Sequence, residues 1–187
     1  LSLRRQRQMC IRDRSSAVHR ELGSEVQCDV AVLGGGLGGC AAALAACRQG
    51  AQVVLTEPTD WIGGQVSQQA VPPDEHTWIE SFGRTESYAL YRELVRDYYR
   101  EQTPLTPEAR AKPNLNPGNG AVSRICHEPR VAVAVLQSML AEEIQCGRLR
   151  LLLNTAPVAA SVSEDRIQSV TCHTTETNRN FTLHATW

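Results

Sequence analysis

The sequence predicts an α/β fold with a parallel sheet, a small antiparallel β-meander and a mostly helical insertion. First, a β-prone run, a glycine-rich turn, a helix and a second β-prone run follow one another within residues 28–57. Second, six of the nine aromatic residues fall between Trp78 and Tyr99, so this stretch has enough large apolar side chains to form hydrophobic contacts of its own. Third, short β-prone segments separated by polar turns occupy the end of the chain. A helical crossover between two neighbouring strands makes them parallel, so the first observation predicts the parallel sheet.

Composition narrows the class of protein. The chain has 187 residues, 42% of them hydrophobic and 21% charged, with a formal net charge of −1. The length suits one domain, or one domain with an inserted segment, and the composition excludes collagen-like, disulfide-scaffold and disordered chains. The absence of a long apolar run predicts no membrane span, and the near-zero charge argues against nucleic-acid binding. The seven cysteines include no C-x-x-C pair, which favours reduced thiols in a cytoplasmic protein and gives no metal-site pattern.

The first residues differ from the rest of the chain. Residues 1–14 carry five arginines against one aspartate, and the chain begins with Leu. The stretch Gln6–Arg14 resembles translated sequencing-adapter strings, so we interpret 1–14 as a non-native head, with a basic arm for an acidic partner as the alternative. Residues 15–27 form a lead-in to the fold.

A βαβ unit occupies residues 28–64. Val30–Leu33 is the first predicted strand, and the alanine-rich segment Gly38–Gln49 favours a helix. Gly50 stands where a helix commonly ends, and Gln52–Thr56 is the second β-branched run.

An insertion is predicted over residues 65–128, and the nucleotide-binding fold continues from 129 to 187. Apolar spacing predicts a helix at Tyr88–Arg100 inside the insertion. Pro129 begins a second amphipathic helix, which ends near Cys146 and is followed by a strand at Leu149–Leu153. The meander strands are expected near 158–163, 166–174 and 180–186.

The glycine run carries the chemistry. Gly34, Gly36 and Gly39 satisfy G-x-G-x-x-G after a strand and at the start of a helix. In this pattern the first glycine permits the tight turn, the second lets backbone approach a pyrophosphate, and the third lets helix and sheet lie close. The helix N-terminus directs N–H groups and its positive dipole end at the phosphates.

Glu57 completes the pattern. It follows Gly34 by 23 residues and stands at the end of the second strand. A carboxylate there accepts hydrogen bonds from ribose hydroxyls and repels a 2′-phosphate. The combination predicts a bound adenine dinucleotide, with NADP disfavoured. The alternative is a structural glycine turn with a chance Glu.

The stretch DVAVLGGGLGGCAAALAACRQGAQVVLTEPTDWIGGQ resembles the amino-terminal signature of FAD-dependent oxidoreductases of the glutathione-reductase-like superfamily. The likeness extends over residues 28–187 and implies a Rossmann-like FAD-binding domain. It implies that glycine-turn backbone holds the pyrophosphate, that Glu57 binds the adenosine ribose, and that Gly64 brings backbone beside the cofactor. It also implies that the backbone of Val158, just past the strand and before the meander, meets the adenine. The pyrophosphate residues implied by the resemblance are Gly34, Gly36, Leu37, Gly38 and Gly39.

The resemblance implies an enzyme that transfers hydride from a small-molecule substrate to flavin, and it identifies no catalytic residue. It also implies a further parallel strand after the meander. Because the chain stops at Trp187, we expect an amino-terminal fragment that is inactive on its own. Two alternatives stay open: an NAD-dependent reductase or dehydrogenase, and a non-catalytic binding protein on the same fold. The substrate, the electron acceptor and the oligomeric state do not follow from the sequence.

Two further features of the sequence are interpreted without a functional role. Cys40 stands at the start of the predicted helix, and we interpret it as a small buried thiol. Asp74, Glu75 and His76 resemble an acid–base or metal cluster, but we interpret them as a solvated loop.

Overall fold

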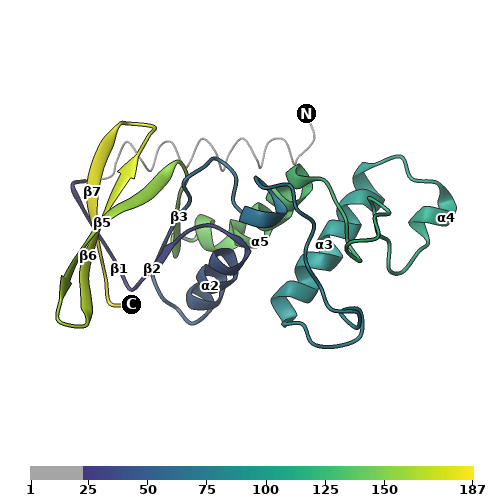
Figure 1. The fold of residues 1–187 in the computed structure, drawn as a ribbon, viewed down its shortest axis with the longest axis horizontal. Helices are drawn as coiled ribbons and strands as arrows, with labels where there is room; N and C mark the ends of the chain where they lie inside the picture. Colours follow the sequence, from purple (N-terminus) through teal and green to yellow (C-terminus); the bar gives the residue numbers. More distant parts are fainter. Residues whose placement is uncertain (1–22) are drawn as a thin grey trace. The chain divides into compact units, whose positions relative to one another are not determined.

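The computed structural model describes residues 23–187. They form two compact units, one holding the chain up to Ile62 together with Leu140–Trp187, the other holding Gly63–Met139. The interpretation of residues 1–14 as a non-native head lies outside the described residues. The strands are β1 (Glu25–Cys28), β2 (Val30–Leu33), β3 (Val53–Thr56), β4 (Leu149–Leu152), β5 (Thr155–Ser163), β6 (Arg166–Thr174) and β7 (Arg179–Ala185). The helices are α2 (Leu37–Arg48), η1 (Gly64–Val66), α3 (Glu86–Gln102), α4 (Pro107–Arg110) and α5 (Pro129–Gln145) (Figure 1).

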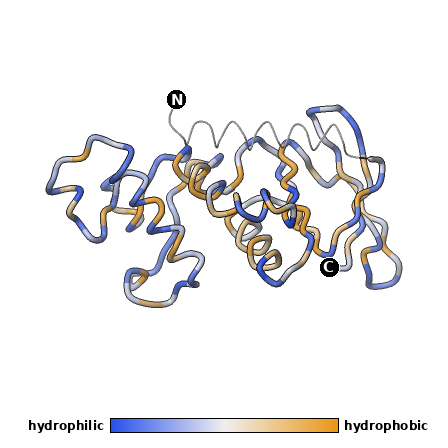
Figure 2. Tube along the Cα trace, turned by 180° about the vertical axis from the view of Figure 1, so that it is seen from behind, coloured by the Kyte–Doolittle hydropathy of each residue, from blue (hydrophilic) through white to orange (hydrophobic). Residues whose placement is uncertain are grey.

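A parallel three-stranded sheet of order β2-β3-β4 is the centre of the first unit. Val53 of β3 pairs with Val30 on one side and with Leu149 on the other. All four residues of β3 are buried, as expected for a central parallel strand that is covered on both faces. In Figure 2 the strands of this sheet are coloured mainly as hydrophobic. The parallel sheet predicted from the βαβ unit is confirmed.

Helix α2 contacts β2 and β3. Its buried residues are small or flexible, namely Cys40, Ala43, Leu44 and Cys47, which allows a close approach to the sheet. The helix ends at Arg48 with Gln49 as its C-cap residue, and Gly50 adopts φ +90° and donates its N–H to the carbonyl of Cys47. The predicted helix therefore exists and begins one residue earlier than expected.

The second sheet of the first unit has the order β1-β7-β6-β5. The β5–β6 and β6–β7 pairs are antiparallel, which confirms the meander. The sequence did not predict β1, which pairs in parallel with β7. Four residues of a lead-in carry too little pattern to predict a strand whose partner residues are 157 positions away in the chain. Side chains from both sheets share one apolar cluster: Val26, Val54, Leu152, Val170, Cys172, Phe181 and Leu183.

The last residue of the chain pairs with β2. The N–H of Trp187 donates to the carbonyl of Asp29 at 3.0 Å, and the N–H of Ala31 donates to the carbonyl of Trp187 at 2.9 Å. Alternate N–H groups of a strand point to opposite edges, and the N–H of Val30 points toward β3, where it donates to Gln52. Trp187 therefore lies on the edge of β2 that faces away from β3.

The second unit is built around α3. The side chain of Thr85 caps the helix by accepting the N–H of Tyr88 at 3.3 Å, and Arg100 lies in its last turn. The predicted helix at 88–100 is confirmed and is longer at both ends. The sequence did not predict α4, a single turn that begins with Pro107 inside the proline-rich segment. Across residues 23–187, no helix is both long enough and apolar enough to span a bilayer.

Candidate dinucleotide-binding site

The turn between β2 and α2 brings the end of a strand against the start of a helix. Gly34 adopts φ +121°, a conformation that residues with a side chain rarely adopt. A Cβ atom on Gly39 would lie 1.9 Å from the carbonyl oxygen of Gly34, so only glycine permits this contact. The first and third glycines of the motif thus have the structural roles that the spacing indicates.

The N-terminus of α2 is open. Its N-cap residue is Gly36, so no side chain caps the helix, and its first turn contains no acidic residue. A Cβ atom built on Gly36 or Gly38 would meet no neighbouring atom within 4 Å. The first N–H groups of an α-helix have no partner inside the helix, and the helix dipole places partial positive charge there. The backbone at Gly36, Leu37, Gly38 and Gly39 therefore forms an uncovered, anion-attracting surface.

Glu57 directly follows β3, and its backbone is held by the neighbouring strands. Its N–H donates to the carbonyl of Leu152, and its carbonyl accepts the N–H of Thr155, each at 2.9 Å. The residue is 2% exposed. Its position is therefore set by the parallel sheet and by the link between β4 and β5.

The carboxylate of Glu57 lies against the glycine turn. A Cβ atom on Gly35 would stand 2.9 Å from both the Cβ and the Oε2 of Glu57, and 3.2 Å from the Cγ2 of Ile62. The structure therefore brings Glu57 and the glycine motif together. Gly35 was not among the expected site residues, because G-x-G-x-x-G leaves its position open.

Thr59 is a second contact that sequence reasoning missed. The Oε1 of Glu57 accepts the backbone N–H of Thr59 at 2.9 Å and its hydroxyl at 2.8 Å. A hydroxyl residue two positions after a carboxylate is a local signal for such a bond, because Ser and Thr side chains readily bond to nearby groups in turns.

Cys40 is a buried thiol, as expected. It is 3% exposed, and its S–H donates to the carbonyl of Gly35 at 3.3 Å. Burial, reinforced by the nearby charge of Glu57, raises the pKa of the Cys40 thiol to about 12. Cys40 therefore remains a neutral thiol despite its place at a helix N-terminus.

Val158 lies within β5, not before the meander as expected, because the strand already begins at Thr155. The pairing of β5 with β6 shifts between Pro157 and Ala159, so Val158 is the extra residue of a β-bulge. Such a residue is left out of the regular ladder. The side chain of Val158 is 57% exposed. Val158 belongs to the four-stranded sheet, whereas Glu57 and the glycine turn follow strands of the three-stranded sheet.

Gly64 belongs to the second unit, where it is the first residue of η1. It adopts φ +55°, and its carbonyl accepts the N–H groups of Ser67 and Gln69 at 3.1 and 3.2 Å. Gly63 also has a positive φ, of +115°. The GG pair therefore forms a turn that suits glycine at both positions.

The interpretation of residues 74–76 as a solvated loop is wrong for Glu75. Its side chain is 2% exposed, forms an ion pair with Arg92 and accepts the hydroxyl of Tyr88 at 2.6 Å. Arg92 also pairs with Glu80, which lies 2.6 Å from the Nη2 of Arg96. The polarity of Glu75 indicated exposure to solvent, but the buried Arg92 of α3 supplies a partner that only the fold reveals.

His127 is half-buried in the second unit. Its Nδ1 contacts the carbonyl of Ile125 at 2.7 Å, and its Nε2 contacts the hydroxyl of Tyr91 at 2.8 Å. A carbonyl only accepts, so Nδ1 carries the proton and Nε2 accepts from Tyr91. Burial lowers the pKa of His127.

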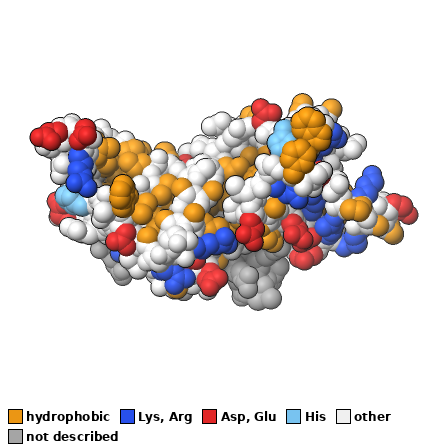
Figure 3. Space-filling model, turned by 90° about the horizontal axis from the view of Figure 1, so that it is seen from below, with side chains coloured by type: hydrophobic (Ala, Val, Ile, Leu, Met, Phe, Trp, Pro, Cys, Tyr) orange, Lys and Arg blue, Asp and Glu red, His pale blue; other side chains and the backbone are white. Residues whose placement is uncertain are grey.

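Two exposed aromatic side chains lie between Glu75 and Arg92 in the sequence. Trp78 and Phe82 are 61% and 60% exposed and stack with their ring centroids 6.0 Å apart. The ring of His76 lies 6.3 Å from Trp78 and 5.9 Å from Phe82. Figure 3 shows apolar side chains gathered beside a histidine on the surface.

Comparisons with known proteins identify the family and the fold. The family model described as FAD dependent oxidoreductase matches residues 29–187. No curated protein matches the sequence. The solved glycerol-3-phosphate dehydrogenase from Bacillus halodurans, complexed with FAD, is similar with a TM-score of 0.54 and 18% identity, over 94% of this chain and 35% of that one. Mycobacterium smegmatis Sdh1 in the apo form has a TM-score of 0.51 and 16% identity, over 87% and 34%.

These likenesses show a shared fold. Sdh1 in complex with UQ1 is similar at a TM-score of 0.50 and 18% identity, over 87% of this chain and 33% of that chain. The present chain therefore spans about a third of the length of these solved proteins.

Proposed function

The chain belongs to the family of FAD-dependent oxidoreductases, whose cofactor is FAD, and on this premise we propose that its first unit binds the adenosine diphosphate half of FAD. We further propose that the protein transfers hydride from a small-molecule substrate to the flavin. The observation that carries the proposal is the contact between Glu57 and the glycine turn, beside an uncovered helix N-terminus.

The residues present fit the cofactor. The open backbone at Gly36 and Gly38 leaves space where a Cβ atom would otherwise stand, and the first-turn N–H groups would hold the pyrophosphate. Leu37 and Gly39 contribute backbone to the same surface, and Gly34 sets the turn. The carboxylate of Glu57, held beside Gly35, would accept the hydroxyls of the adenosine ribose and disfavour a 2′-phosphate.

Two further residues extend the proposal. The bulge at Val158 leaves backbone out of the β5–β6 ladder, which supports a role in contacting the adenine edge. Gly64 would bring backbone close to the cofactor, as the GG pair of the glutathione-reductase-like superfamily implies. We also propose that residues 65–128 are an insertion that leads toward the substrate.

When bound, FAD supplies the hydride-accepting chemistry, and the protein supplies position and polarity. In this chain the backbone of the turn binds the diphosphate, and Glu57 orients the ribose. We assign no catalytic residue. The family match favours an FAD-dependent over an NAD-dependent enzyme. We also propose that the protein is cytoplasmic, because its cysteines show neither a C-x-x-C pair nor a disulfide framework.

The test is the cofactor content of the purified protein. We expect a yellow protein that releases FAD on denaturation. A colourless protein that binds NAD in a titration would support the nicotinamide alternative instead. A colourless protein that binds neither nucleotide would support a non-catalytic binding protein.

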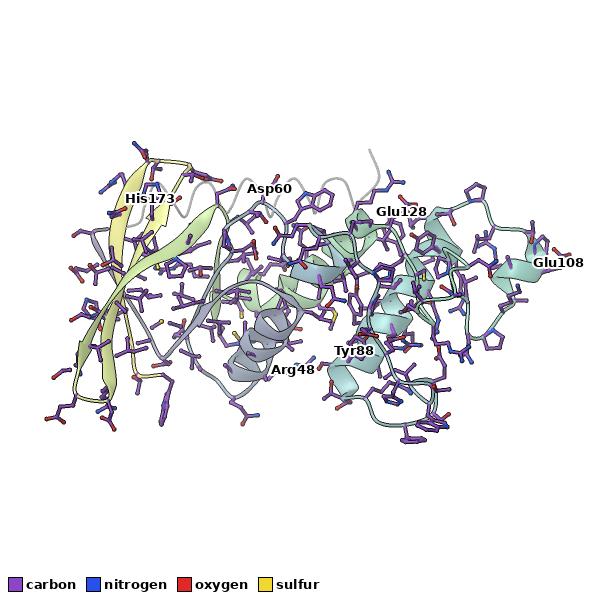
Figure 4. The ribbon with its side chains drawn as sticks, in the orientation of Figure 1. Arg48, Asp60, Tyr88, Glu108, Glu128 and His173 are labelled. Atoms are coloured by element: carbon purple, nitrogen blue, oxygen red, sulfur yellow. The ribbon has the colours of Figure 1, made fainter. Side chains whose placement is uncertain are left out.

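The residue-level test is Glu57→Ala. Loss of the ribose hydrogen bonds should raise the Kd for FAD, since a hydrogen bond to a charged group contributes about 1.5–3 kcal/mol. Asp60→Ala is the matched control, because Asp60 is an exposed carboxylate three residues further on, in the loop after β3 (Figure 4). An unchanged Kd for Glu57→Ala would contradict the assigned role.

A further inference from the structure

We infer that Thr59 is the positioning residue for Glu57: its hydroxyl holds the carboxylate in the orientation that binds the adenosine ribose. The inference rests on the proposed function, and it adds that affinity for FAD depends on a side chain outside both the glycine motif and the acidic position.

The Thr59 hydroxyl accepts one hydrogen bond and donates its own proton to Glu57. The N–H of Trp61 donates to the Oγ1 of Thr59 at 3.2 Å, and the Thr59 hydroxyl lies 2.8 Å from the Oε1 of Glu57. The carbonyl of Trp61 is a second acceptor, at 3.1 Å. The hydroxyl has one proton, and a carboxylate is the stronger acceptor, so the shorter contact to Glu57 takes it. The backbone N–H of Thr59 adds a second bond to the same oxygen, at 2.9 Å.

The backbone that presents Thr59 is anchored. The carbonyl of Thr59 accepts the N–H of Asn154 at 3.0 Å, directly beside the bonds that hold Glu57 to Leu152 and Thr155. Both residues are therefore attached to the same β4–β5 link. The distance between the Thr59 hydroxyl and the Glu57 carboxylate is set by the sheet and not by a mobile loop.

Gly35 bounds the carboxylate on its other side. A Cβ atom on Gly35 would stand 2.9 Å from Oε2, while Thr59 donates to Oε1, so Gly35 adjoins one oxygen of the Glu57 carboxylate and Thr59 bonds to the other. At 2% exposure, water gives Glu57 little alternative hydrogen bonding. Removing the hydroxyl therefore leaves Oε1 with only the backbone N–H of Thr59 as a donor from that residue, and the carboxylate can rotate out of its present orientation.

The experiment compares Thr59→Val, which keeps the branched shape and loses the hydroxyl, with Thr59→Ser, which keeps the hydroxyl. The Kd of the apoprotein for FAD is measured by titration calorimetry. We expect Thr59→Val to raise the Kd about tenfold, and Thr59→Ser to remain within about twofold of the wild type. Thr59→Ala is a second hydroxyl-free variant in case Thr59→Val does not fold.

A double-mutant cycle separates positioning from a general structural effect. If Thr59 acts through Glu57, Thr59→Val in a Glu57→Ala background should change the Kd no further. Additive losses would overturn the inference, as would a Thr59→Ser variant as weak as Thr59→Val. A wild-type protein that binds no FAD would refute the proposed function itself. FAD binding that depends on Glu57 but not on the Thr59 hydroxyl would refute only the inference.

Discussion

Substitution of the third motif glycine tests the closeness of α2 and β2. In Gly39→Ala the new Cβ atom would lie 1.9 Å from the carbonyl oxygen of Gly34, whereas real Cβ atoms essentially never approach within 3.0 Å. The strand end and the helix start must therefore separate by about 1.1 Å, a shift of backbone against backbone that no rotamer change relieves. Overpacking of this kind costs about 1–3 kcal/mol, and part of that cost is offset by the higher helix propensity of Ala, about 1 kcal/mol.

Gly38→Ala is the matched control, because Gly38 lies in the same helical turn and its Cβ atom would meet nothing within 4 Å. Here only the propensity gain applies, so we expect Gly38→Ala to be as stable as the wild type or more stable. The assay is urea unfolding of the apoproteins, followed by far-UV circular dichroism, with midpoints and m-values compared. Equal free energies of unfolding for Gly39→Ala and Gly38→Ala would refute the close packing of strand and helix described above.

Three further outcomes follow from the buried polar groups. Cys40, with its pKa raised to about 12, should resist alkylation at about pH 8 while the exposed Cys146 reacts, and mass spectrometry of the peptides would show the opposite if the helix dipole activated Cys40. Burial lowers the pKa of His127 below the 6.5 of an unfolded chain, so its contribution to stability is complete above about pH 6.5 and declines as the pH falls below that value. His127→Gln should therefore flatten this part of the curve of unfolding free energy against pH. An unchanged slope would contradict the assignment. Arg92→Met should destabilise the protein by about 3–5 kcal/mol because it leaves the buried carboxylate of Glu75 without its cation, whereas Arg130→Met, at a pair whose side chains are 72% and 49% exposed, should change the unfolding midpoint little.

The β2–α2–β3 unit could be predicted from sequence because its signals are local. A β-branched run, a glycine turn and an alanine-rich helix each depend on neighbouring residues, and the crossover itself makes the strands parallel. The same holds for α3, whose apolar spacing is regular. The prediction failed where a partner is remote: β1 is four residues long and pairs with β7 at the other end of the chain.

At the candidate site, the sequence could indicate Gly34, Gly36, Gly39 and Glu57 because backbone sterics and strand ends dictate residue type at those positions. It could not indicate Gly35, whose lack of a side chain matters only because the Glu57 carboxylate lies against it. Nor could it show that Val158 is the extra residue of a bulge, since that depends on the register of β6.

The amino-acid sequence alone determined the strand–turn–helix order and the glycine positions, because local backbone geometry admits few residues there. Only the tertiary structure decided that Glu57 contacts Gly35, that Thr59 presents its hydroxyl to that carboxylate, and that the side chain of Glu75 is buried beside Arg92. Those contacts depend on strand register and on residues that are distant in the sequence and meet only after folding. Hydrophobic periodicity carries no information about such contacts.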